Sequence, residues 1–224
     1  MTIDLGEAYK TARERISRVV TGDSIDPELP VTATPEWTLH CVIAHLSGIA
    51  ADASTGNMEG APGEAWTAAQ VARGAGRTLA EMVAEWEQTG PLIEGFLSSP
   101  AGDTASAAVM DVHTHEADLR LALGSSALVP AGFLAWAGSS MRDGFAEQVA
   151  TAGLSPVDVT ASDFEWFRAR LGRRTVAEVT AYRWSADPAR YLDSFFIFGR
   201  ASTSLGESSL GESSLDESSL GERS

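Results

Sequence analysis

Four segments among the first 124 residues carry apolar side chains at the spacing of an amphipathic helix, and loops containing glycine, proline and aspartate separate them. An amphipathic helix gains most of its stability by burying its apolar stripe against another element. Four such helices joined by loops can bury their stripes in one common core. The sequence therefore predicts a mainly α protein with a four-helix bundle over residues 1–124. The segments cover Leu5–Val20, 34–52, 77–97 and 110–124.

Capping signals predict where two of these helices begin. Thr34 is expected to be the N-cap of the second helix, with Pro35 in the first turn. Thr78 and Glu81 have the spacing of a capping box and predict the start of the third helix. That helix is expected to bend near Pro91, because proline cannot donate a backbone hydrogen bond.

The pattern changes after residue 124. Residues 125–200 contain helical segments and one short alternating run, VDVTA (157–161), and predict a small C-terminal domain that is mainly helical with little strand. Residues 201–224 repeat the motif SSLGE, which offers too few apolar side chains to offset the entropy cost of ordering the chain. We expect this low-complexity tail to be disordered.

Charge and composition limit the expected partners. The chain has 16 lysines and arginines against 31 aspartates and glutamates, a formal net charge of -15, so a nucleic acid partner is not expected. No apolar run approaches the roughly 20 residues that span a bilayer, and the acidic opening is unlike a signal peptide. A single cysteine suits a reducing compartment. We expect a cytoplasmic protein with no membrane partner, and the sequence does not predict its oligomeric state.

The segment over residues 110–124 contains two histidines and several carboxylates. Because helix positions advance by about 100° each, Asp111, His115 and Asp118 share one face. His113 and Glu116 point elsewhere and are expected to be solvent-exposed or packing residues. An aspartate and a histidine four residues apart can give one oxygen and one nitrogen to a divalent metal ion, as metal sites in bundle cores do.

A metal site of this kind needs a ligand from a second helix, and His45 is the candidate because it lies on an apolar stretch. Asp118 can accept the free ring N–H of a ligating histidine and so fix its tautomer. Two alternatives remain open from the residues alone. The histidines can be hydrogen-bonded core residues with chance spacing. Cys41, one turn before His45, can be a fourth, soft ligand or a small buried apolar residue, and His40 lies off the His45 face.

Four stretches carry a family resemblance: TPEWTLHCVIAHLSG, QVARGAGRTLAEMVAEWEQTGPLIEGFL, MDVHTHEADLRLALG and FEWFRARLGRRTVAEVTAYRWSADPARYLDSFFIFG. Together they resemble the mycothiol-dependent maleylpyruvate isomerase family, whose N-terminal half belongs to the DinB-like metal-binding four-helix bundles. The resemblance extends to Gly199 and implies a metal site at His45, Asp111 and His115. Asp111 stands where the family has a longer glutamate, so the helix lies closer to the metal, a water fills the gap, or metal affinity is weaker. The C-terminal domain looks trimmed relative to larger relatives.

The resemblance implies an enzyme that depends on a metal and on a low-molecular-weight thiol. The implied cofactors are mycothiol and a divalent metal ion, with zinc expected among the metals that nitrogen and oxygen ligands suit. The metal favours the thiolate, which then attacks a small electrophile in an S-transferase or a cis–trans isomerase reaction. No catalytic residue beyond the metal-bound thiol is expected, because the sequence shows no Ser-His or Cys-His signature.

Arg173 is the candidate for binding a carboxylate of the thiol cofactor, because a guanidinium group pairs with carboxylates in a bidentate manner. Its neighbour Arg174 is the alternative. The structural interpretation of either arginine is a surface ion pair with Glu178 or Asp163.

Two classes of function therefore remain. The first is the thiol-dependent transferase or isomerase, which predicts a metal site with an open position. The second is a non-catalytic metal- or ligand-binding helical bundle with a stress or regulatory role, which predicts a site closed by a fourth protein ligand such as Cys41.

Overall fold

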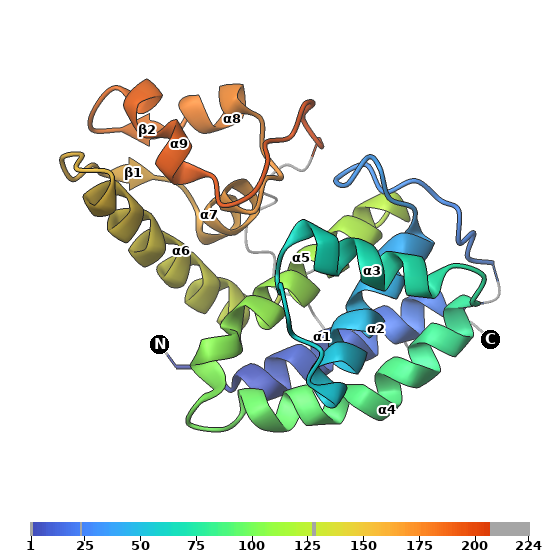
Figure 1. Ribbon diagram of the computed structural model, residues 1–224. Helices are drawn as coiled ribbons and strands as arrows, with labels where there is room; N and C mark the ends of the chain where they lie inside the picture. Colours follow the sequence, from blue (N-terminus) through green and yellow to red (C-terminus); the bar gives the residue numbers. More distant parts are fainter. Residues whose placement is uncertain (1, 23, 127–128, 207–224) are drawn as a thin grey trace, which may run out of the picture.

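A computed structural model describes residues 2–22, 24–126 and 129–206, and it is mainly helical, as predicted. Figure 1 shows two groups of elements, with α6 leading from the first to the second. The first group consists of α1 (Leu5–Val20), α2 (Leu39–Thr55), α3 (Glu64–Gly74), α4 (Leu79–Leu97), the 3-10 turn η1 (Gly102–Ala105) and α5 (Ser106–Ala122). In the described residues, no helix is long and apolar enough to cross a membrane.

Four of these helices surround one core. Helix α1 packs against α4 and α5, and α2 packs against α4 and α5, while α3 lies on the outer side of α2. Large side chains fill the centre, where Trp86 donates its indole N–H to the hydroxyl of Tyr9 at 3.0 Å and the two rings meet edge to face. Both side chains are fully buried. The polar atoms of these two core side chains are thus paired with each other.

The start of α2 differs from the prediction. Thr34 is not a helix cap: its carbonyl accepts from the backbone N–H of Trp37 at 2.8 Å in a turn, and Pro30 forms a β-bridge with Thr38. The helix begins at Leu39, with Thr38 as N-cap. The capping signal was overridden because the backbone groups of this loop are used in the turn and the bridge. The loop that results carries Trp37 back toward the bundle.

Two further helix boundaries bear on the site. The capping box of Thr78 and Glu81 is confirmed at the start of α4, which continues through Pro91. Helix α3, in contrast, was not predicted, because its residues were assigned to a loop and left without an element. Helix α5 begins at Ser106, before the predicted segment, and Gly124 follows its end with a φ of 70°.

The second group of elements surrounds an aromatic cluster. It consists of α6 (Ala131–Thr151), β1 (Val159–Thr160), α7 (Asp163–Arg170), α8 (Val176–Thr180), β2 (Arg183–Trp184), η2 (Pro188–Arg190) and α9 (Leu192–Phe195). The strand predicted in VDVTA is present as β1, which pairs antiparallel with β2 through Val159 and Trp184. The rings of Phe145, Trp166 and Phe195 lie in mutual contact between α6, α7 and α9. The tail expected to be disordered covers residues 201–224, of which 207–224 lie outside the described residues. In the described part, Ala201 donates its backbone N–H to the carbonyl of Arg174 at 3.2 Å, and the hydroxyl of Ser204 donates to Glu178 at 2.7 Å.

Candidate metal centre

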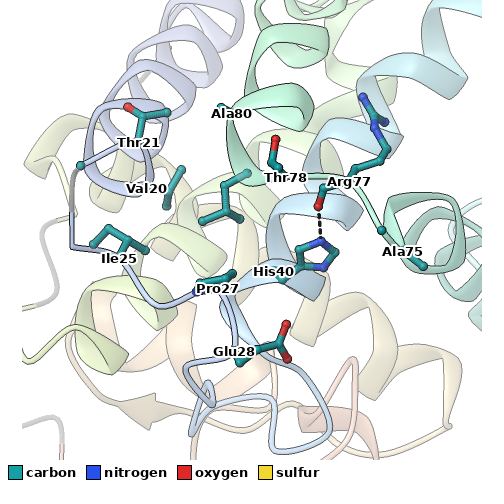
Figure 2. Close-up of a pocket in the computed structure, with 13 residues that line it drawn as sticks. Val20, Thr21, Ile25, Pro27, Glu28, His40, Ala75, Arg77, Thr78 and Ala80 are labelled. Carbon is teal, nitrogen blue, oxygen red and sulfur yellow. Dashed lines mark hydrogen bonds between the residues drawn. The ribbon is translucent and has the colours of Figure 1, made fainter.

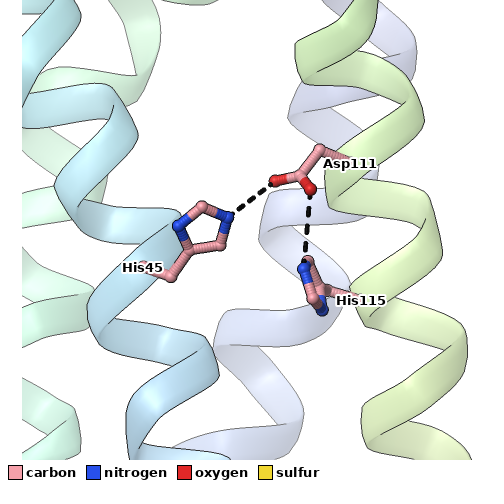
Figure 3. A group of neighbouring side chains, drawn as sticks. All are labelled: His45, Asp111 and His115. Carbon is pink, nitrogen blue, oxygen red and sulfur yellow. Dashed lines mark ion pairs between the residues drawn. The ribbon is translucent and has the colours of Figure 1, made fainter. Parts of the chain in front are cut away.

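Two helices bring the three predicted ligands together. Helix α2 carries His45, and α5 carries Asp111 and His115 one turn apart (Figure 3). The His45 Nε2 atom lies 3.2 Å from Asp111 Oδ2, and the His115 Nε2 atom lies 3.5 Å from Asp111 Oδ1. One ligand atom from each residue lies within 4.8 Å of the others. The three side chains therefore converge on one point.

The donor set fits a divalent metal ion. Two imidazole nitrogens and one carboxylate oxygen are ligands that zinc and other first-row divalent metals accept. With metal–ligand bonds of about 2.1 Å in a tetrahedron, two ligand atoms are about 3.4 Å apart. The nitrogen-to-oxygen distances of 3.2 and 3.5 Å involve different oxygens of Asp111, and one ligand atom from each residue lies within 4.8 Å of the others, so the three side chains would close in slightly around an ion. Among the described residues no hydrogen-bond donor satisfies the buried Oδ2 of Asp111, so a cation there would supply a partner that the protein does not.

Each histidine has an acceptor near its second ring nitrogen. The His45 Nδ1 atom lies 2.8 Å from the amide oxygen of Gln70, whereas the His115 Nδ1 atom lies 3.4 Å from Oδ2 of Asp118 without a well-aligned hydrogen bond. An acceptor at Nδ1 favours the tautomer with a proton on that atom and a lone pair on Nε2. Both Nε2 lone pairs then face Asp111, which is the arrangement that a metal ligand requires.

Asp118 is the most deeply buried carboxylate at the site. Its side chain is completely inaccessible to solvent, and it pairs with Arg168 at 2.8 Å and with Arg173 at 2.7 Å, both from the segment that begins with α7. Burial would raise the pKa of Asp118, but Arg173 and Arg168 hold it well below its usual range. The carboxylate is therefore ionised and can accept the His115 ring N–H.

The charges within the cluster also shift the pKa values of the ligands. Burial would raise the pKa of Asp111, but the neighbouring His115 and His45 lower it to about 2. Burial would lower the pKa of His45, but Asp111 and the hydrogen bond with Gln70 raise it above its ordinary value. A negative carboxylate thus attracts positive charge at this point, whether the charge is a proton or a metal ion.

One side of the site is covered by an aromatic ring and another reaches solvent. Trp37 lies over both histidines, with ring centroids 5.2 Å from His45 and 5.8 Å from His115. The Asp111 side chain is 33% exposed, in contrast to the two histidines. Cys41 is not a member of the cluster and instead lies 3.6 Å from the hydroxyl of Thr38. In the described part of the chain, three side chains therefore form the donor set.

The two residues of α5 that were expected to point elsewhere do so. His113 is buried and stacks on Phe133 with a centroid distance of 3.7 Å, so it is a packing residue. Glu116 is also buried, and it pairs with Arg15 at 2.6 Å and with Arg120 at 3.0 Å. Neither residue belongs to the cluster of His45, Asp111 and His115.

The arginines of the segment LGRRT form ion pairs inside the protein. Arg173 directs Nε and Nη2 at the carboxylate of Asp118, and Arg174 directs the same pair of atoms at Glu165. These partners differ from the Glu178 and Asp163 considered from the sequence. The role of Arg173 in cofactor binding stays a prediction, and it would have to use N–H groups that do not face Asp118.

A separate pocket lies at one end of the bundle (Figure 2). It has a volume of about 720 Å³, and its wall includes Thr21, Ile25, Thr78 and His40, whose Nε2 atom lies 2.8 Å from the carbonyl oxygen of Arg77. None of the three cluster residues lines this pocket. His40 is thus directed away from His45, Asp111 and His115, as its position on the helix predicted.

Comparisons with protein-family models, with curated proteins and with solved structures gave no match to this chain. The site therefore has to be interpreted from its own geometry. Two residues that contact it were missed from the sequence, Gln70 and Trp37. The position of Trp37 could have suggested its role, because a tryptophan shortly before the helix that carries His45 can fold back over that helix. Nothing in the sequence points to Gln70, which lies on the unrecognised helix α3.

Proposed function

We propose that this protein is a metal-dependent enzyme that uses a low-molecular-weight thiol and belongs to the mycothiol-dependent maleylpyruvate isomerase family, with a DinB-like bundle over residues 1–124. Its reaction is S-transfer to a small electrophile or cis–trans isomerisation of one. The observation that carries the proposal is the convergence of His45, Asp111 and His115, with no fourth histidine, cysteine, aspartate or glutamate in the cluster among the described residues. Three protein ligands with a further position left open are characteristic of catalytic rather than structural zinc sites.

The residues of the chain would hold the metal and shape its surroundings. His45 and His115 offer Nε2 atoms, and Asp111 offers one oxygen, from two helices that are packed against each other. When bound there, a divalent metal would favour the thiolate form of a thiol at neutral pH. Trp37 presents a flat apolar surface beside the histidines, which excludes water from one side of the site. The protein itself then needs no nucleophile.

A non-catalytic metal- or ligand-binding bundle is the second candidate. The observation that favours it is the separation between the cluster and the pocket of Figure 2, whose lining includes none of the three ligands. A purely structural site would bind metal with no position left for a thiol, so direct binding of a thiol distinguishes the two candidates.

The test uses cobalt(II) as a spectroscopic substitute for zinc. The cobalt-loaded protein is titrated with mycothiol, with glutathione and cysteine in parallel, and a sulfur-to-cobalt charge-transfer band is expected with mycothiol. The zinc-loaded protein is then assayed with mycothiol against a panel of small electrophiles, with His115→Ala as the inactive variant and His113→Ala as its matched control. A cobalt spectrum that no thiol changes would overturn the enzyme proposal in favour of the second candidate.

A further inference from the structure

A series of hydrogen-bonded polar side chains leads away from Nδ1 of His45, on the side opposite Asp111. Gln70 on α3 places its amide oxygen 2.8 Å from His45 Nδ1, and its amide nitrogen donates to Oδ2 of Asp52 at 2.9 Å. The other oxygen of Asp52 accepts from Asn57 at 2.8 Å and pairs with Arg73 at 2.7 Å. Gln70 is 1% exposed and Asp52 is 4% exposed. Water therefore does not compete with the two contacts of Gln70, whereas Arg73 at the far end of the series is 44% exposed.

Each hydrogen bond in this series of side chains has only one possible assignment of donor and acceptor. The pKa of Asp52 lies below its ordinary value because, although burial opposes it, Arg73 and Gln70 favour the charged form, so the carboxylate can only accept. The NH2 group of Gln70 must then face Asp52, and its carbonyl oxygen must face His45. Because that oxygen needs a donor, the single proton of the neutral His45 ring lies on Nδ1, and the lone pair of Nε2 faces Asp111 at 3.2 Å.

Helix α3 can hold Gln70 at this position because two glycines allow it close to α2. A Cβ atom on Gly48 would lie 2.7 Å from Cβ of Gln70, and a Cβ atom on Gly74 would lie 2.3 Å from Cβ of Ala44. Both separations are shorter than packed carbon atoms tolerate. Gly48 is one turn after His45 on α2, so the close approach occurs beside the ligand.

We propose that Gln70 is a positioning residue that selects the tautomer of His45 through its link to Asp52. This inference rests on the proposed metal site, because its consequence is a free Nε2 lone pair at the cluster. Without an acceptor at Nδ1, the proton of His45 would move to Nε2 and form a hydrogen bond with Asp111 Oδ2, which lies within reach at 3.2 Å. That proton would compete with the metal ion for the same position.

The test compares the metal-free proteins by nitrogen-15 NMR of the histidine side chains, at a pH high enough for the His45 ring to be neutral, where the method distinguishes the two tautomers. Zinc affinity is then measured. Gln70→Met, which has a similar size and no acceptor, should shift His45 to the Nε2–H tautomer and raise the dissociation constant for zinc about 10- to 100-fold. Gln70→Glu places a second carboxyl group beside Asp52, so the two share one proton, and its other oxygen stays beside Nδ1 as an acceptor and should keep the wild-type tautomer. If Gln70→Met does not fold, Gln70→Asn, whose shorter side chain withdraws the acceptor, replaces it.

A matched control separates positioning from the general stability of α3. Trp66 is buried on the same helix and donates its indole N–H to the carbonyl of Asn57 at 3.0 Å, but it does not contact His45. Trp66→Leu should lower the melting temperature and leave the His45 tautomer unchanged. The inference is overturned if Gln70→Met retains the Nδ1–H tautomer, or if Trp66→Leu shifts it equally. A wild-type protein that has this tautomer but does not bind zinc would refute the proposed function and leave the tautomer selection standing.

Discussion

Asp118 on α5 pairs with two arginines from the second group of elements, and replacing it tests how that group is attached to the bundle. Asp118 and Arg168 are both completely buried, and Arg173 is 11% exposed. Asp118→Asn preserves the volume of the side chain and removes its charge. The amide keeps one acceptor oxygen and turns an NH2 group toward a guanidinium group, so at least one of the two ion pairs is replaced by a contact between donors.

The size of the effect follows from the burial of these charges. Removing one partner of a buried ion pair costs about 3–5 kcal/mol, because the remaining charge loses the group that compensated its desolvation. In a chain of this length, 1 kcal/mol corresponds to roughly 2–4 °C in melting temperature. The expected decrease for Asp118→Asn is therefore about 6–20 °C. Asp193→Asn is the control, since it removes an ion pair with Arg200 in which the carboxylate is 98% exposed, and it should change the melting temperature by less than about 2 °C.

The pH dependence gives an independent check by thermal unfolding. Because the pKa of Asp118 in the folded protein lies well below its usual range, its contribution to stability is fully present above the unfolded-state pKa of about 3.9 and decreases as the pH falls below it. The difference in melting temperature between wild type and Asp118→Asn should shrink when the pH is lowered from about 6 to about 3. If Asp118→Asn lowers the melting temperature at neutral pH no more than Asp193→Asn does, this reasoning is refuted.

Three further outcomes are expected. His45→Ala should abolish zinc retention, measured by elemental analysis. His113→Ala should retain zinc, although its melting temperature should fall because the stacking of His113 on Phe133 is lost. Equal zinc loss in both variants would show that the wrong face of α5 was assigned. Gly48→Ala should destabilise the protein by about 1–3 kcal/mol in denaturant unfolding, since its Cβ atom would collide with Gln70, and an unchanged midpoint would contradict that packing. Truncation after residue 206 keeps the hydrogen bond from the Ser204 hydroxyl to Glu178 and should leave the melting temperature unchanged, because the SSLGE repeat offers few apolar side chains. A decrease of several degrees would show that the tail binds to the protein.

The elements with strong local signals could be predicted from the sequence. The spacing of apolar residues gave α1 with the bounds that the structure has, and the capping box gave the start of α4. Within α5, the 100° advance per residue was enough to place Asp111 and His115 on one face, and the apolar context of His45 indicated the second helix. These inferences succeed because they depend on geometry within one helix or on a contrast with the immediate neighbours.

Helix α3 could not be recognised in the same way, for a physical reason. Its buried face consists of Trp66, Gln70 and Gly74, which contains a single large apolar side chain. Such a face has little amphipathic contrast, and the helix is held by the close approach to α2 at Gly48 instead. Long-range contacts of this kind also decide where the second ring nitrogen of His45 is bound. The three clustered residues could therefore be predicted from the sequence, whereas Gln70, which contacts Nδ1 of His45, could not.

The aspartate at position 111 illustrates how the structure narrows an alternative that the sequence left open. A carboxylate one methylene shorter than glutamate could leave a gap, yet its two oxygens lie 3.2 and 3.5 Å from the Nε2 atoms of His45 and His115. The two separations involve different oxygens, and one ligand atom from each of the three residues lies within 4.8 Å of the others. The short side chain thus already reaches the region where the two rings converge. In the proposed metal site, α5 would lie close enough to α2 for an aspartate to be the ligand, and an added methylene would displace the carboxylate from that region.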